Sequence, residues 1–175
     1  MNFFAINSSR VAFLVVMTLW LCGCNSLDHA ARNGPIPKGK SIVFGSILVK
    51  SSVSGWFESG NVTVINTRNS EPVLEHPVKG LGGPFYWSLP PGQYAILDLC
   101  VHRSIGDERT SSRRIFAEFS IDSEQTAVYV GTLGLASSLP SVTDDFDTAV
   151  KTFHSQFPTL NTEPIKQLLH FEKRK

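Results

Sequence analysis

Short apolar runs separated by Gly, Pro and Ser dominate the chain from Ser41 onward. The six clearest runs span residues 42–49, 62–66, 84–89, 93–101, 115–121 and 126–135. Runs of this length, bounded by turn residues, are typical of β-strands. In residues 115–121, apolar Ile, Ala, Phe and Ile fall on one face, with Glu118 and Ser120 on the other. That alternation predicts a strand with one buried and one solvent-facing side.

A Pro-Pro-Gly turn, Pro90-Pro91-Gly92, separates the runs at 84–89 and 93–101. Proline fixes φ at the corner and glycine then supplies the positive φ that a tight reversal needs. We therefore predict a β-hairpin here. Because the strands follow one another without intervening helices, the fold class predicted for residues 41–140 is mainly β, an antiparallel β-sandwich of about seven strands.

The periodicity changes after residue 140. Apolar side chains now recur at helical spacing, at Phe146, Ala149, Val150, Phe153 and Phe157. This pattern predicts an amphipathic helix that packs on the sandwich and ends at Pro158. A weaker helix is predicted after Thr162, with one apolar side formed by Ile165, Leu168 and Leu169. Together they make residues 141–175 a C-terminal helical extension.

The N-terminus has the pattern of a secretory signal peptide. Arg10 precedes an apolar run over residues 11–21, which is shorter than the roughly 20 residues that a membrane-spanning helix needs. The run ends in Leu21-Cys22-Gly23-Cys24, which resembles the lipobox of bacterial lipoproteins. The resemblance implies that residues 1–23 are removed and that the Cys24 thiol carries diacylglycerol. An ordinary secreted protein or a short uncleaved anchor is the alternative.

This resemblance has consequences for the mature chain. Residues 24–40, rich in Asn, Ser, Gly and Pro, become a lipidated tether. Several acyl chains on Cys24 hold a protein at a membrane far more firmly than one myristoyl chain, which binds only marginally. Asn25, rather than Asp, implies sorting to the outer membrane, with the domain facing the periplasm. Cys100 is then the only free thiol, and its apolar surroundings predict a buried, unreactive side chain.

The residues of the predicted hairpin carry a second resemblance to known proteins. Residues 83–96 read Gly-Pro-Phe-Tyr-Trp-Ser-Leu-Pro-Pro-Gly-Gln-Tyr-Ala-Ile. They resemble the Phe-x-Trp-x-Leu-Pro-Pro-Gly-x-Tyr-x-Ile hairpin of prealbumin-like β-sandwich modules. Those modules include carboxypeptidase-regulatory-like and collagen-binding-B-like domains and the DUF2846 group of uncharacterised lipoproteins. The resemblance implies a prealbumin-like sandwich, and it transfers no catalytic residue because the modules share none.

Charge is balanced overall and uneven in one place. The 16 Lys+Arg and 15 Asp+Glu exclude the broad positive field of a nonspecific nucleic-acid binder. The local excess of positive charge lies within residues 102–114, at Arg103, Arg109, Arg113 and Arg114. Guanidinium groups suit bidentate anion recognition, so this segment is a candidate contact for anionic lipid headgroups, lipopolysaccharide phosphates or a partner protein. A solvated hairpin loop is the alternative.

Motifs for catalysis or metal binding do not stand out. The chain has no Gly-x-Ser-x-Gly elbow, and its five histidines lack metal-ligand spacing. We therefore predict no catalytic residue, metal or cofactor. The function predicted is a non-enzymatic lipoprotein of the bacterial cell envelope, anchored through Cys24, that acts as a structural or protein-binding module. The alternatives are an envelope hydrolase or carbohydrate-modifying enzyme, and a small-ligand carrier.

Overall fold

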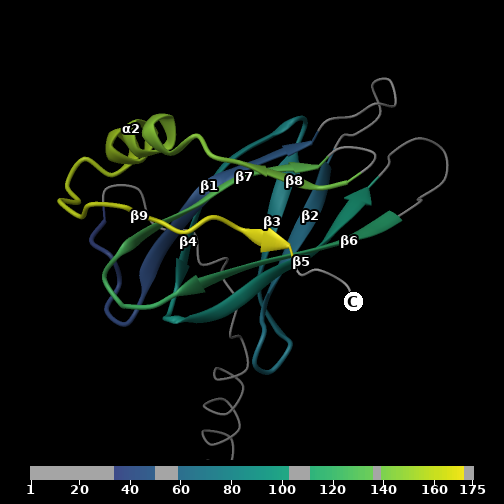
Figure 1. Ribbon diagram of the computed structural model, residues 1–175, viewed down its shortest axis with the longest axis horizontal. Helices are drawn as coiled ribbons and strands as arrows, with labels where there is room; N and C mark the ends of the chain where they lie inside the picture. Colours follow the sequence, from purple (N-terminus) through teal and green to yellow (C-terminus); the bar gives the residue numbers. More distant parts are fainter. Residues whose placement is uncertain (1–33, 50–58, 103–110, 136–138, 172–175) are drawn as a thin grey trace, which may run out of the picture.

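The computed structural model describes residues 34–49, 59–102, 111–135 and 139–171, which form two packed β-sheets with a helix on the outside of one (Figure 1). The predicted mainly β fold is confirmed. The longer strands are β1 (Ser41–Val49), β2 (Ser59–Asn66), β3 (Glu71–Lys79), β4 (Gly82–Leu89), β5 (Gly92–His102), β6 (Ser111–Ile121) and β7 (Ala127–Leu135). The remaining elements are β8 (Ser141–Thr143), α2 (Phe146–Gln156), β9 (Ile165–Lys166) and β10 (His170–Phe171).

The first sheet is mixed, whereas a wholly antiparallel sandwich was predicted. Its strand order is β4-β1-β7-β8, and β9 also pairs with β7. β1 and β7 run parallel. Parallel neighbours cannot be joined by a tight hairpin, and here the chain between them passes through the other sheet. The second sheet has the order β10-β6-β5-β2-β3, and its pairs are antiparallel.

The Pro-Pro-Gly turn joins the two sheets, so the predicted hairpin is wrong. β4 pairs with β1, whereas β5 pairs with β2 and β6. The Tyr94 hydroxyl donates a hydrogen bond to the Pro90 carbonyl oxygen at 2.8 Å. A tyrosine that bonds back to the backbone a few residues upstream is a corner device of β-sandwiches. Proline and glycine therefore suit a turn that connects two sheets as well as a turn that closes a hairpin.

The apolar pattern of the sequence did not predict β3, because β3 is an edge strand. It contains Pro72 and Pro77, and it lies at the end of the second sheet. Proline is tolerated at such an edge because part of the backbone there has no strand to pair with. Leu74 and Val78 are its buried apolar residues, which is too few for a recognisable apolar run.

Two apolar clusters hold the three layers together. The larger one lies between the sheets and includes Trp87, Tyr94 and Phe119. The second joins the first sheet to α2 and consists of Ile36, Ile42, Phe44, Ala127, Tyr129, Phe153 and Phe157. The predicted helix is confirmed by α2, and Phe153 stacks on Phe44 with ring centroids 4.6 Å apart. Because Ile36 is buried, packing begins before Ser41.

The chain after α2 forms a strap across one side of the sandwich, and the weaker helix predicted there is wrong. We call residues 165–171 the C-terminal strap. The backbone N–H groups of Gln167 and Leu169 donate to Tyr129 and Val130 of β7, and β10 then pairs with β6 of the other sheet. Leu169 is 5% exposed and belongs to the cluster between the sheets. Pairing with β7 therefore satisfies backbone groups that a helix would have satisfied internally.

Candidate functional site

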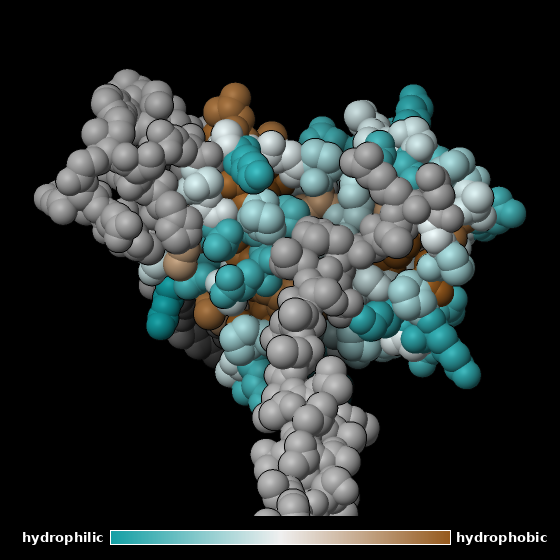
Figure 2. All heavy atoms as spheres, turned by 180° about the vertical axis from the view of Figure 1, so that it is seen from behind, coloured by the Kyte–Doolittle hydropathy of each residue, from teal (hydrophilic) through white to brown (hydrophobic). Residues whose placement is uncertain are grey.

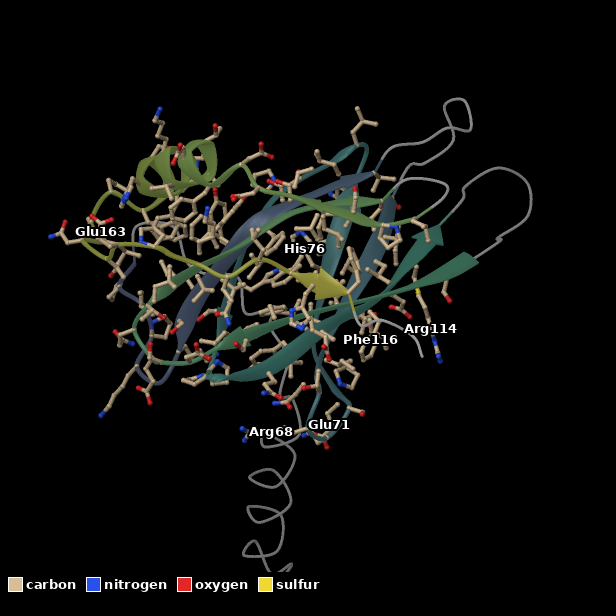
Figure 3. All side chains as sticks on the ribbon, in the orientation of Figure 1. Arg68, Glu71, His76, Arg114, Phe116 and Glu163 are labelled. Atoms are coloured by element: carbon tan, nitrogen blue, oxygen red, sulfur yellow. The ribbon has the colours of Figure 1, made fainter. Side chains whose placement is uncertain are left out.

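Most of the predicted site residues lie outside the part of the chain that the structure describes. This applies to Cys24, Arg103 and Arg109. Arg113 lies in β6 opposite Leu99, and its side chain is outside the described part of the structure. Arg114, opposite Asp98, is exposed (Figure 3). The lipid attachment and the arginine cluster therefore stay predictions.

A groove of about 270 Å³ runs along the outer face of the first sheet beside α2. We call it the sheet–helix groove. It is lined by Phe44, Gly45, Ser46, Leu48, Pro84, Tyr86, Thr132, Asp145, Thr148, Ala149 and Thr152. The sheet supplies most of the apolar lining, whereas α2 contributes the hydroxyls of Thr148 and Thr152. These residues come from β1, β4, β7, α2 and, for Asp145, the position just before α2, so no local motif in the sequence marks the groove.

One carboxylate gives the groove a negative end. Asp145 is the only charged residue among those lining the groove. The neighbouring Asp144 pairs with Lys166 of the C-terminal strap at 2.9 Å. That hydrogen bond lowers the pKa of Asp144 and raises the pKa of Lys166. The charge of Asp144 is therefore balanced by Lys166. Asp145 then determines that the charge of the groove is negative.

Tyr129 fixes the start of α2 at this end. Its ring is buried in the cluster beneath the helix, and its hydroxyl oxygen accepts a hydrogen bond from the Asp145 backbone N–H at 2.8 Å. Burial raises the pKa of Tyr129, and the hydrogen bonds with Asp145 and Thr132 oppose that rise. The phenol therefore stays protonated at neutral pH and positions the groove wall.

A second cleft, of about 310 Å³, lies where β3 turns into β4. It is lined by Ile47, His76, Pro77, Val78, Lys79, Gly82, Gly83 and Pro84. His76 is half-buried, and its ring meets the rings of Phe85 and Trp87 edge-on, at centroid distances of 6.0 and 5.7 Å (Figure 3). His76 therefore packs against the aromatic core, and no carboxylate converges on it among the lining residues.

The side chains that could act as metal ligands or as a nucleophile in the described ranges do not form a cluster. No three His, Cys, Asp or Glu side chains gather there as metal ligands would. Cys100 is half-buried rather than buried as predicted. Burial, and then the charges of Asp98 and Glu75, raise the pKa of its thiol, which disfavours the reactive thiolate.

Comparison with known proteins gives no further assignment: no family model, curated protein or solved structure matches this chain. In the ranges that the structure describes, no helix has the length and apolarity to cross a membrane. The fold and the groove thus define a mainly β protein of two packed sheets with an open groove on its outer face.

Proposed function

We propose that the protein is a non-enzymatic lipoprotein of the bacterial cell envelope that binds another envelope protein through the sheet–helix groove. The observation that carries the anchor is Leu21-Cys22-Gly23-Cys24 at the end of an apolar run, twelve positions before Ile36, the first buried residue of the described chain. Lipid on Cys24 holds the domain at the membrane. Asn25 places that membrane as the outer one, with the domain in the periplasm.

A prealbumin-like sandwich is part of the proposal. The residues that carry the resemblance fill structural positions. The rings of Phe85 and Trp87 stack at 3.8 Å between the sheets, and Tyr94 closes the corner at Pro90. These roles support the fold resemblance and explain why the motif says nothing of a catalytic site.

The composition of the groove favours binding over catalysis. An apolar floor with a few placed polar groups orients a ligand. Hydrolysis by paired acid and base groups needs two titratable side chains acting together, and Asp145 is the one carboxylate among the lining residues. A carrier of small ligands requires a cavity between sheet and helix, where the rings of Phe44, Phe153 and Phe157 are packed.

The groove is tested by comparing two tryptophan variants of α2. Thr152 and Lys151 are both exposed, and only Thr152 lines the groove. We expect crosslinking in intact cells, followed by gentle detergent extraction, to recover the same defined partner with wild type and Lys151→Trp, and at least several-fold less with Thr152→Trp. Equal recovery with both variants, or a monodisperse monomer without a partner, contradicts the proposal.

A further inference from the structure

The C-terminal strap fastens the two sheets together and also contacts the start of α2. It runs as β9 beside β7, crosses the side of the sandwich and ends as β10 beside β6 (Figure 1). Leu169 anchors it in the cluster between the sheets. On the opposite side of the molecule, hydrophilic and hydrophobic side chains of the described residues are interspersed (Figure 2). The strap, by contrast, brings several specific contacts to one place, the start of α2.

The two ends of α2 are held in different ways. Its second half is held by Phe153 and Phe157, which are buried in the cluster beneath the helix. At its first residue, Phe146 is only partly buried, and the N-cap residue Asp145 makes no side-chain hydrogen bond to the helix, although this position usually supplies one. A helix of 11 residues is marginal in isolation. The first turn therefore depends on contacts from outside α2.

Lys166 of the strap supplies one of these contacts. Its ammonium group binds one carboxylate oxygen of Asp144 at 2.9 Å, while the other oxygen accepts the Phe146 backbone N–H at 3.2 Å. The same ammonium group lies over the Phe146 ring, 5.3 Å from the ring centroid. Asp144 thus replaces the missing cap, and Lys166 holds both this cap and the first aromatic ring of the helix.

Tyr129 of β7 connects the strap to the same turn. Its backbone carbonyl oxygen accepts the Gln167 N–H of the strap at 2.8 Å, and its hydroxyl oxygen accepts the Asp145 N–H at 2.8 Å. Its ring contacts the Phe146 ring, with centroids 5.4 Å apart. Because the strap and the start of α2 are both attached to this residue, a shift of one changes the contacts of the other.

The first turn of α2 is also a wall of the sheet–helix groove. Asp145, Thr148 and Ala149 line the groove. The Ala149 N–H closes the turn by donating to the Asp145 carbonyl oxygen at 2.9 Å. Fraying of the turn breaks that hydrogen bond and moves these lining residues together. The groove therefore keeps its shape only while the turn is formed.

We propose that the C-terminal strap regulates the sheet–helix groove, with Lys166 as the positioning residue. Docking of the strap on β7 holds the first turn of α2, and that turn forms the groove wall. Displacement of the strap from β7, for example by a competing strand, loosens the wall. Coupling of this kind is reciprocal, so a partner that binds the formed groove also holds the strap on β7. The inference rests on the proposed function in that it concerns the same partner site.

Amide hydrogen exchange of the purified full chain tests the link without any partner. Lys166→Met removes the ammonium group, and Lys79→Met, the matched control, removes the same charge from an exposed position in β3. We expect Lys166→Met to exchange about two- to fivefold faster at the Ala149 and Val150 amides, the change that one exposed ion pair supports. The Phe157 amide, which is bonded at the other end of the helix, keeps its rate. Lys79→Met leaves all three rates unchanged.

A double-mutant cycle tests whether Lys166 acts through Asp144. Asp144→Asn keeps an oxygen for the Phe146 N–H and removes the charge that binds Lys166. We expect it to speed exchange at Ala149 about as much as Lys166→Met does. Because both substitutions remove the same ion pair, the double variant should exchange at nearly the rate of either single variant.

Methyl signals in the NMR spectrum follow the groove itself. Thr148 and Ala149 line the groove, whereas Val62 and Val64 lie between the sheets. We expect Lys166→Met to shift the methyl signals of the first pair and to leave those of the second pair in place. A substitution that only lowered stability would shift neither pair under native conditions, so this measurement reports on the position of the groove wall.

Wild-type exchange at Ala149 and Val150 in Lys166→Met overturns the proposal, and so does additive acceleration in the double variant. Equal acceleration at the Val62 and Val64 amides means a loss of global stability and also overturns it. These measurements are independent of the partner. If crosslinking recovers no partner while the exchange results are as expected, the proposed function fails and the link between strap and groove stands. A partner that is lost with Thr152→Trp, together with unchanged exchange in Lys166→Met, gives the reverse.

Discussion

Tyr94 illustrates how one side chain stabilises a corner between two sheets. Its ring is buried and its hydroxyl donates to the Pro90 carbonyl oxygen at 2.8 Å. We expect Tyr94→Phe to lower the free energy of unfolding by about 1 kcal/mol, the usual net value of one hydrogen bond, as measured by denaturant unfolding. Gln93→Ala, an exposed neighbour, should change it by less than about 0.5 kcal/mol. Equal losses in the two variants contradict this role.

The two buried tyrosines predict instability in alkali. Burial raises the pKa of both Tyr94 and Tyr129 above the ordinary value of 10.0. A group whose pKa is higher in the folded state contributes its full stability below the unfolded pKa and loses it as the pH rises through the folded pKa. We expect the free energy of unfolding to fall above pH 10.0, and the double variant Tyr94→Phe/Tyr129→Phe to fall less steeply. An unchanged slope in that variant argues against the tyrosines as the cause.

Among the elements, the C-terminal strap offers a matched pair of leucines. Leu169 lies between the sheets, whereas Leu168 is exposed. We expect Leu169→Ala to lower the free energy of unfolding by about 2–5 kcal/mol, the cost of emptying a core site. Leu168→Ala should cost less, about 1 kcal/mol, because the Leu168 side chain is already 36% exposed in the folded state. Denaturant midpoints of the two variants that coincide would show that the strap does not close the core.

The sequence predicted those elements whose pattern is local. Alternation in residues 115–121 and helical spacing from Phe146 to Phe157 each reflect one buried face, and both elements formed as expected. β3 was missed because, as an edge strand with two prolines, it buries only Leu74 and Val78 and so shows no apolar run. The C-terminal strap was missed because it pairs with strands remote in sequence, β7 and β6. The groove was missed for the same reason, since four elements contribute its lining.

At the scale of the whole molecule, the proposed partner contact lies on the outside of the two-sheet sandwich. The sheet–helix groove follows the outer face of the first sheet beside α2, and the larger apolar cluster lies between the sheets, away from it.

The anchor on Cys24 is tested most directly by metabolic labelling with radioactive palmitate. Cys22→Ala is the matched control, because it removes a cysteine two positions away and leaves the lipidated one in place. We expect wild type and Cys22→Ala to incorporate label and to stay with the membrane fraction, and Cys24→Ala to lose the label and leave that fraction. Label that persists in Cys24→Ala would contradict the assignment of this protein as a lipoprotein.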